Sequence, residues 1–197
     1  MAYVDPRLEG KPVPAVSVVK FEGEHIARLG RSKGSDIAFL DQKIPAYRRE
    51  IINMIGMGVT ENVKDPDLAP KIKAPAHGFA IAYARAPKGC GAALHRHPTE
   101  EVFVTLKGKW EIYWLEGDAE RSVVLDPGDI VNVPIGVYRG FRNASDDPNS
   151  TLMAIVGGPD PGKVDKVDWH PSVIEEARKT GLAVDDDGNL ITAEAAQ

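Results

Sequence analysis

The sequence contains a single cysteine, Cys90, so the chain cannot form a disulfide within itself. It also lacks any apolar run approaching the roughly 20 residues that a membrane-spanning helix requires, which predicts no membrane partner. The first residues carry charges and prolines instead of an apolar stretch, and this pattern predicts no signal peptide. We therefore expect a protein of the reducing cytoplasm.

An excess of basic charge is lacking as well. The 197 residues include 24 Lys and Arg against 29 Asp and Glu, which gives a formal net charge of −5. Because nucleic-acid binding needs a basic face to neutralise phosphates, this balance argues against a nucleic-acid partner. Hydrophobic residues make up 43% of the chain and charged residues 27%, a composition typical of a globular domain with a buried core.

Glycine and proline are spread along the chain, with short apolar runs between them. From residue 79 onward the turn residues recur about every 8–12 positions, which favours a barrel or sandwich of short antiparallel strands. The sequence thus predicts an all-β fold. The predicted strands are 79–86, 101–106, 110–115, 122–125, 130–133, 137–142 and 152–156.

This pattern divides the chain into an N-terminal extension at 1–78, a barrel at 79–157 and a C-terminal part at 158–197. In the extension, the apolar segments 16–21 and 51–59 have the character of strands. The extension is interpreted either as further strands on the barrel or as an arm that covers a dimer partner.

The C-terminal part contains one helix signal. Pro171 precedes a capping-box spacing from Ser172 to Glu175, and Gly181 is a stop signal, so we predict a short helix over about 173–180. The acidic tail after Gly181 is expected to be loose.

Three good metal ligands, His95, His97 and Glu101, lie close together at even spacing. On an extended strand, even offsets place all three side chains on one face and point Glu100 away from it. Two neutral imidazoles and one carboxylate would then converge on a point and suit Fe(II), Mn(II), Ni(II) or Zn(II).

Two spaced motifs surround these ligands. Residues 89–108 read G-x5-H-x-H-x3-E-x6-G, and residues 128–143 read G-x5-P-x-G-x2-R-x3-N. Together and in this order they resemble the two motifs of the cupin family, and the strand pattern extends the resemblance to about 79–157. The resemblance implies a cupin-type antiparallel β-barrel, also called a double-stranded β-helix or jelly roll. It also implies a homodimer built through added strands.

The sequence departs from the family pattern at Arg139, where the resemblance implies a histidine as fourth metal ligand. Arginine stays protonated and is not expected to bind a metal. In a first interpretation three ligands hold the metal, and Arg139 clamps a carboxylate or phosphate of the substrate. In a second interpretation the metal has been lost, and Arg139 pairs with Glu101. In a third, His77 or Tyr138 completes the site.

These features predict a metal-dependent enzyme that acts on a small anionic organic substrate, with iron as the favoured metal. Two histidines and a carboxylate leave open positions for O₂ and substrate, which favours a non-haem iron dioxygenase. The alternatives are a metal-dependent isomerase, lyase or decarboxylase, and a non-catalytic ligand-binding cupin without metal. Arg139 is the expected catalytic residue, as an anion clamp or oxyanion stabiliser. The residues expected to line the substrate pocket are Phe103, Trp114, Tyr138 and Phe141.

Overall fold

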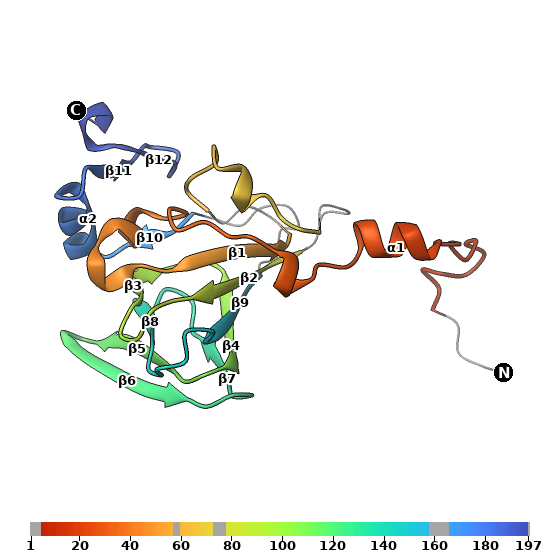
Figure 1. Cartoon of the computed structure of the whole chain (residues 1–197), viewed down its shortest axis with the longest axis horizontal. Helices are drawn as coiled ribbons and strands as arrows, with labels where there is room; N and C mark the ends of the chain where they lie inside the picture. Colours follow the sequence, from red (N-terminus) through yellow and green to blue (C-terminus); the bar gives the residue numbers. More distant parts are fainter. Residues whose placement is uncertain (1–4, 57–59, 73–77, 158–165, 197) are drawn as a thin grey trace.

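Two five-stranded antiparallel sheets lie face to face in the computed structural model, which describes residues 5–56, 60–72, 78–157 and 166–196 (Figure 1). The first sheet has the order β1-β2-β9-β4-β7, and the second has the order β10-β3-β8-β5-β6. The strands of the first sheet are β1 (Glu50–Ile55), β2 (Phe79–Arg85), β9 (Thr151–Gly157), β4 (Glu100–Lys107) and β7 (Ile130–Val133). Those of the second sheet are β10 (Asp168–Trp169), β3 (Gly91–Arg96), β8 (Arg139–Asn143), β5 (Trp110–Glu116) and β6 (Ala119–Leu125).

The main hydrophobic core lies between the two sheets, because alternate residues of each strand point inward. Phe103 of β4 and Leu152 of β9 enter it from the first sheet, and Trp110 of β5 and Phe141 of β8 enter it from the second. The Phe141 ring packs edge-on against Phe103 at a centroid distance of 5.3 Å and against Trp110 at 5.8 Å. These aromatic contacts join the two sheets.

The predicted all-β antiparallel fold is confirmed, and every strand predicted from residue 79 onward is present. The largest error in a strand end is at β6, which begins at residue 119 instead of 122. Of the strands in the two five-stranded sheets, β3 and β10 are absent from the predicted set. The two residues of β10 become a strand only through pairing with distant β3, where Asp168 lies opposite Arg96 and Trp169 opposite His95.

Strand β1 falls within the predicted N-terminal extension and yet belongs to a barrel sheet. It pairs with β2 from Glu50 opposite Arg85 to Ile55 opposite Ile81. It overlaps the strand predicted at 51–59, of which residues 57–59 lie outside the described part of the chain. The extension therefore supplies an added strand, while the boundaries at 78 and 157 remain predictions.

The strand predicted at 16–21 is wrong, because this segment lies largely in the helix α1 (Val18–Glu24). Ser17 caps the helix by accepting a hydrogen bond from the backbone N–H of Lys20 at 3.2 Å. None of the helical residues is buried, and α1 stands away from the barrel as an arm (Figure 1). Apolar β-branched residues favour a strand only where a sheet is present to receive them, and the arm meets no sheet within the described residues.

The predicted C-terminal helix is confirmed as α2 (Pro171–Arg178), two residues earlier than expected. Its N-cap is His170, so Ser172 lies inside the first turn instead of capping it. Val173 and Ala177 of α2 pack on Trp169 and on the N-terminal segment at Leu40, which forms a second apolar cluster beside the barrel. Short 3-10 turns span Leu29–Arg31, Leu40–Lys43, Pro45–Tyr47, Pro66–Leu68 and Ala193–Ala196.

The expectation of a loose tail is wrong for the residues that follow α2. They form a hairpin of β11 (Leu182–Val184) and β12 (Leu190–Thr192). Asp185 closes the turn, because its Oδ1 accepts hydrogen bonds from the backbone N–H groups of Asp187 at 3.0 Å and Asn189 at 2.7 Å. Leu182 joins the cluster under α2, and this burial orders the segment.

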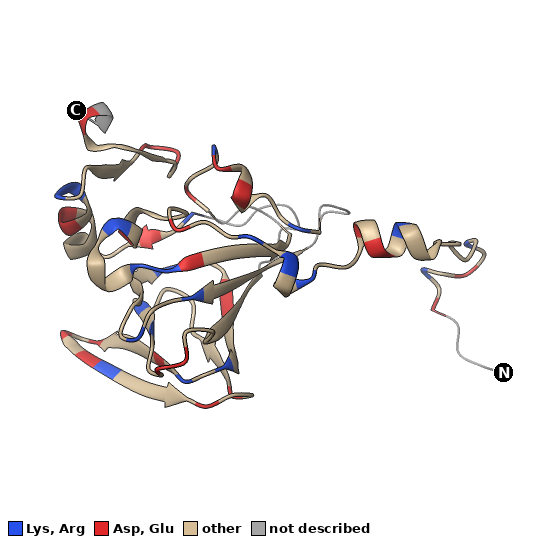
Figure 2. Ribbon diagram, in the orientation of Figure 1, with Lys and Arg blue, Asp and Glu red and all other residues tan. Residues whose placement is uncertain are grey.

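Charged residues of both signs are interspersed along the outer strands (Figure 2). On β6, Glu120 accepts a hydrogen bond from Arg142 of β8 at 2.6 Å, and Arg121 donates one to Glu116 of β5 at 2.8 Å. Among the described residues, no helix is long and apolar enough to cross a membrane.

Candidate metal centre

The structure brings His95, His97 and Glu101 together inside the barrel. Each is at most 6% exposed, and one potential ligand atom from each lies within 4.8 Å of the other two. The rings of His95 and His97 meet edge-on at a centroid distance of 5.4 Å. The convergence predicted from their spacing is therefore present.

The reason given for that convergence needs correction. The three residues do not share one strand, because β3 ends at Arg96 and β4 begins at Glu100. His95 belongs to the second sheet and Glu101 to the first, and His97 lies in the turn that carries the chain between them. The even spacing nevertheless predicts the convergence, because the face of β3 that carries His95 and the face of β4 that carries Glu101 both point into the space between the sheets. Glu100 is exposed, as the alternation predicts.

The backbone fixes how His95 presents its ring. Its Nδ1 lies 2.7 Å from the carbonyl oxygen of Ala93. A carbonyl can only accept, so Nδ1 carries the hydrogen and the lone pair is on Nε2. Burial lowers the pKa of His95 well below its usual value, and the nearby positive charge of Arg139 lowers this pKa further. His95 is thus neutral, as a metal ligand must be.

Glu101 is joined to Arg139 in a buried ion pair. The Nε of Arg139 donates to Glu101 Oε2 at 2.9 Å, and its Nη2 donates to the same oxygen. The remaining terminal nitrogen, Nη1, donates to the backbone oxygen of His95 at 3.1 Å. Both bonds to the carboxylate end on Oε2, so Oε1 lies outside the pair. This is the ion pair of the second interpretation, and the role of Arg139 on a substrate remains a prediction.

The third interpretation finds no support in the described residues. The Tyr138 ring packs edge-on against His170 at 5.1 Å, and the guanidinium of Arg96 lies 4.7 Å from its centre. Tyr138 is not part of the potential ligand group. His77 lies outside the described part of the chain.

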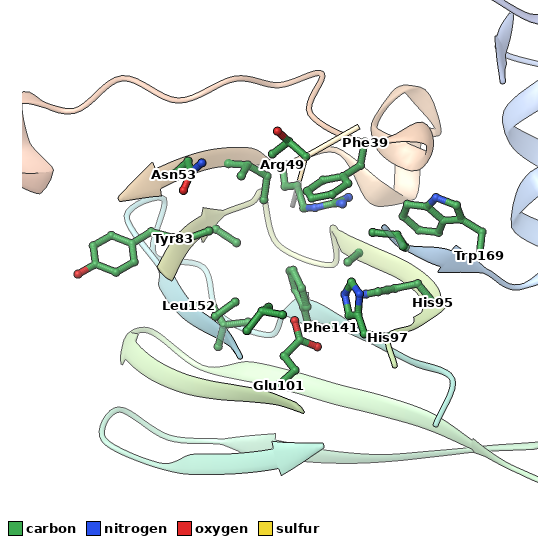
Figure 3. A pocket seen from close by; sticks show the side chains of 18 residues that line it. Phe39, Arg49, Asn53, Tyr83, His95, His97, Glu101, Phe141, Leu152 and Trp169 are labelled. Atoms are coloured by element: carbon green, nitrogen blue, oxygen red, sulfur yellow. The ribbon is translucent and has the colours of Figure 1, made fainter. Parts of the chain in front are cut away.

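A mainly apolar cavity borders the three ligands (Figure 3). Of the four predicted pocket residues, Phe141 lines this cavity, while Phe103 is fully buried behind it. Trp114 lines a different cavity, at β5 and β7, and Arg139 borders that one as well. Phe103 and Tyr138 line neither cavity, so of the four predicted residues Phe141 alone borders the three ligands.

Most residues of the cavity wall have no counterpart in the sequence-based prediction, among them Arg49, Asn53 and Trp169. Arg49 approaches from the residue before β1, Asn53 from within β1, and Trp169 from β10, with its ring 5.4 Å from that of His95 (Figure 3). A signal for the first two is present in the sequence. Arg49 and Asn53 alternate with apolar residues on one face of a strand, where an inward polar side chain needs an explanation.

Comparison with known proteins identifies the family of the domain that holds these residues. Residues 82–155 match the family model described as "Cupin domain". The chain carries a cupin domain. The predicted cupin-type barrel is thereby confirmed, and the match spans both the ligand strands and the second motif.

Among curated proteins, this cupin is similar to "Acireductone dioxygenase 1" of Nocardia farcinica, with 31% identity over 101 residues. The match covers 51% of this chain and 52% of that protein, so the cupin spans about half the length of its curated relative. Solved structures of similar fold include an oxalate decarboxylase formate complex from Lactobacillus farciminis and a vicilin from Corylus avellana. Their identities are 17% and 18%, and for both the TM-score is 0.42 with 60% of this chain and 31% of the other covered.

Proposed function

We propose that this cupin is a metal-dependent enzyme acting on a small anionic organic substrate, with His95, His97 and Glu101 holding a divalent metal. The proposal rests on one observation, the buried convergence of these three ligand atoms within 4.8 Å. Exposed acidic clusters are common without a metal, whereas buried histidines beside a buried carboxylate carry a desolvation cost that a metal offsets.

The groups around the ligands fit a metal. The Ala93 carbonyl orients His95 with Nε2 available, and Arg139 holds Glu101 through Oε2 while Oε1 lies outside the ion pair. Such outer hydrogen bonds to histidine and carboxylate ligands are typical of metal sites, because they fix ring and carboxylate orientation. The donor set suits Fe, Mn, Ni or Zn.

The net charge of the groups around the metal ligands favours one class of substrate. His95 is neutral, and the Glu101 carboxylate is compensated by Arg139, so a bound divalent ion would leave an excess of positive charge in an apolar cavity. Apolar walls concentrate such a field, which favours an anionic substrate. When bound, the metal supplies Lewis-acid or redox chemistry. The chain itself orients the ligands, excludes water through the walls at Phe141 and Trp169, and holds Glu101 in place through Arg139.

Within this class we favour a non-haem iron dioxygenase. Three protein ligands leave open positions for O₂ and substrate. The partial similarity to a protein named acireductone dioxygenase supports this choice. An isomerase, lyase or decarboxylase that uses the metal as a Lewis acid has the same ligand requirements.

The Glu101–Arg139 pair favours one alternative of a different class, a non-catalytic cupin that binds a small ligand without metal. In this alternative, Arg139 alone compensates the buried carboxylate. The two functions make opposite predictions about metal content.

Elemental analysis of the untagged protein, purified without chelator and under anaerobic conditions, distinguishes them. We expect about one iron, manganese, nickel or zinc ion per chain, lost in His97→Ala. His25→Ala, in the N-terminal arm, is the matched control and should keep the metal. If the wild type binds no metal after incubation with each ion, the metalloenzyme proposal is wrong and the ligand-binding alternative stands.

A further inference from the structure

The wall of the cavity opposite the ligands carries two polar side chains. Arg49 precedes β1 and Asn53 lies within it, and with Ile51 between them they face the cavity (Figure 3). The ligands His95 and Glu101 border the same cavity from β3 and β4. A molecule bound at the ligands would therefore meet β1 on its other side.

Arg49 is held rigidly. Its guanidinium carbon lies 5.4 Å from the ring centre of Phe39 and 5.9 Å from that of Phe141, so aromatic rings flank it. Its Nη1 donates to Asp41 Oδ2 at 2.8 Å and to the backbone oxygen of Gly91 at 2.9 Å. Because the group is anchored at one nitrogen and flanked by rings, its orientation is set before any ligand arrives.

The nitrogen Nε, on the other edge of the Arg49 guanidinium, is not anchored as Nη1 is. Arg49 is 5% exposed, and its Nε has no hydrogen-bond partner among the described residues. Nε and Nη2 form one edge of a guanidinium and match the two oxygens of a carboxylate. Arg139 grips Glu101 with this same edge. A buried donor without a partner is costly, and a bound carboxylate would remove that cost.

Asn53 adds an acceptor to the same wall of the cavity, four residues along the chain from Arg49. It is 2% exposed, and its Nδ2 donates to the backbone oxygen of Leu68 at 3.1 Å. Its Oδ1 has no hydrogen-bond partner among the described residues. The amide is fixed by its donor side, so its oxygen is available to accept a hydrogen bond from a hydroxyl or N–H group of a ligand.

We propose that Arg49 binds the carboxylate of the substrate through its Nε–Nη2 edge and that Asn53 accepts a hydrogen bond from a hydroxyl group of the same molecule. The substrate class is a short hydroxycarboxylate. The cavity is small, with about 70 Å³ open to water-sized groups, which suits a small organic molecule. This inference rests on the proposed function only in placing the substrate beside His95, His97 and Glu101. It assigns to Arg49 the anion binding that the sequence analysis predicted for Arg139.

Lactate, lactamide and propionate are the probes that test it, titrated by calorimetry into the protein as purified without chelator. Lactamide replaces the carboxylate by a neutral amide, and propionate lacks the hydroxyl. We expect lactate to bind at least about tenfold more tightly than either. In Arg49→Lys the charge beside Asp41 remains but the two-nitrogen edge is lost, so lactate affinity should fall about tenfold or more. Arg48→Lys, at the exposed neighbouring position, is the matched control and should bind as the wild type does.

A second measurement uses the wild-type protein and remains valid if Arg49→Lys does not fold. In a spectrum of ¹⁵N-arginine-labelled protein, the Nε–H signal of Arg49 should shift on addition of lactate and not of lactamide. The inference is overturned if no probe binds, if lactamide binds as well as lactate, or if the Arg49 signal does not move. Equal binding of lactate and propionate overturns the role of Asn53.

These outcomes are separate from those of the proposed function. If the protein holds no metal but lactate shifts the Arg49 signal, the anion site is real and the metalloenzyme proposal fails. If metal binds to the wild type and to Arg49→Lys alike while lactate binds neither, the metal centre stands and the anion site does not exist.

Discussion

Arg139 and Glu101 form a buried ion pair that joins the two sheets of the barrel, with both hydrogen bonds ending on Oε2 of the carboxylate. Arg139 comes from β8 and Glu101 from β4. A third bond, from Arg139 to the backbone oxygen of His95, ties the pair to the adjacent ligand. The pair therefore contributes both to the stability of the barrel and to the geometry of the metal centre.

Removing one member of this pair should be costly. Arg139→Leu or Glu101→Leu leaves a buried charge without its partner, so we expect each to lower the free energy of unfolding by about 3–5 kcal/mol. The double variant leaves no unpaired charge and should cost much less than the sum, as urea denaturation can measure. Arg121→Leu breaks the exposed pair with Glu116 and should change stability by less than about 1 kcal/mol. Additive losses in the double variant would contradict this account.

Arg139 also occupies the position at which a substitution could add a fourth metal ligand. It lies opposite His95 in the pairing of β8 with β3, so a histidine there would share a face with His95. We expect Arg139→His to raise metal affinity by about tenfold or more, measured by competition with a zinc-binding dye. Arg121→His, on the exposed β6, is the control.

The outcome of that substitution also separates the proposed functions. If turnover falls while metal affinity rises, Arg139 serves the reaction. If the wild type holds no metal and only Arg139→His binds it, the non-catalytic alternative is correct. Unchanged metal affinity would contradict the placement of residue 139 beside the ligands.

Glu61 should make stability depend on pH. It is 1% exposed and accepts hydrogen bonds from Trp169 Nε1 at 2.7 Å and from the backbone N–H of Leu40 at 2.6 Å. Burial raises its pKa from 4.5 to about 7. Because the folded state holds this proton more tightly than the unfolded state, the stabilisation is fully present below about pH 4.5 and is lost as the pH rises through about 7.

The expected size of this loss is about 3 kcal/mol between those two pH values. Urea denaturation across the range should show it in the wild type and not in Glu61→Gln, which cannot titrate. Glu175→Gln, at an exposed position of α2, should retain the wild-type dependence. An identical pH profile for Glu61→Gln and the wild type would show that Glu61 is ionised normally.

Gly140 is required by close packing between strands. A Cβ at this position would lie 2.3 Å from Cζ of Tyr113 and 2.5 Å from the backbone oxygen of Ala92. We expect Gly140→Ala to lower the unfolding free energy by about 1–3 kcal/mol or more, because β8 must move away from β3 and β5. Gly157→Ala meets its nearest atom at 3.8 Å and should be neutral within about 0.5 kcal/mol. Equal melting temperatures for the two variants would contradict this packing.

The N-terminal arm should bind a second copy of the chain, as predicted by the interpretation of the extension as an arm that covers a dimer partner. Val18, Val19 and Phe21 are 80%, 83% and 52% exposed, and a helix as short as α1 is unstable in water without packing. Light scattering after gel filtration should give a dimer for the wild type and a monomer for Val19→Lys with Phe21→Lys. Lys20→Glu keeps the apolar side chains and should remain dimeric. A monomeric wild type at all concentrations would refute the proposal.

The sequence alone determined the barrel and the ligand triad, because both leave local signals. Strands from residue 79 onward alternate with turn residues, and this period is readable without tertiary contacts. His95, His97 and Glu101 are neighbours in sequence, so any tight connection between two inward-facing strands brings them together. The motifs at 89–108 and 128–143 then resemble the cupin pattern, which the family match confirms.

The tertiary structure alone decided the features that depend on contacts distant in sequence. Whether residues 18–24 form a helix or a strand depended on the presence of a sheet to receive them. The partner of Arg139 lies 38 positions away on the opposite sheet, and short-range patterns do not specify such a pairing. Arg49 reaches the cavity only because β1 adds to the sheet through β2. Charge and polarity in the sequence show which groups need partners, but the packing of the two sheets decides which partner each one meets.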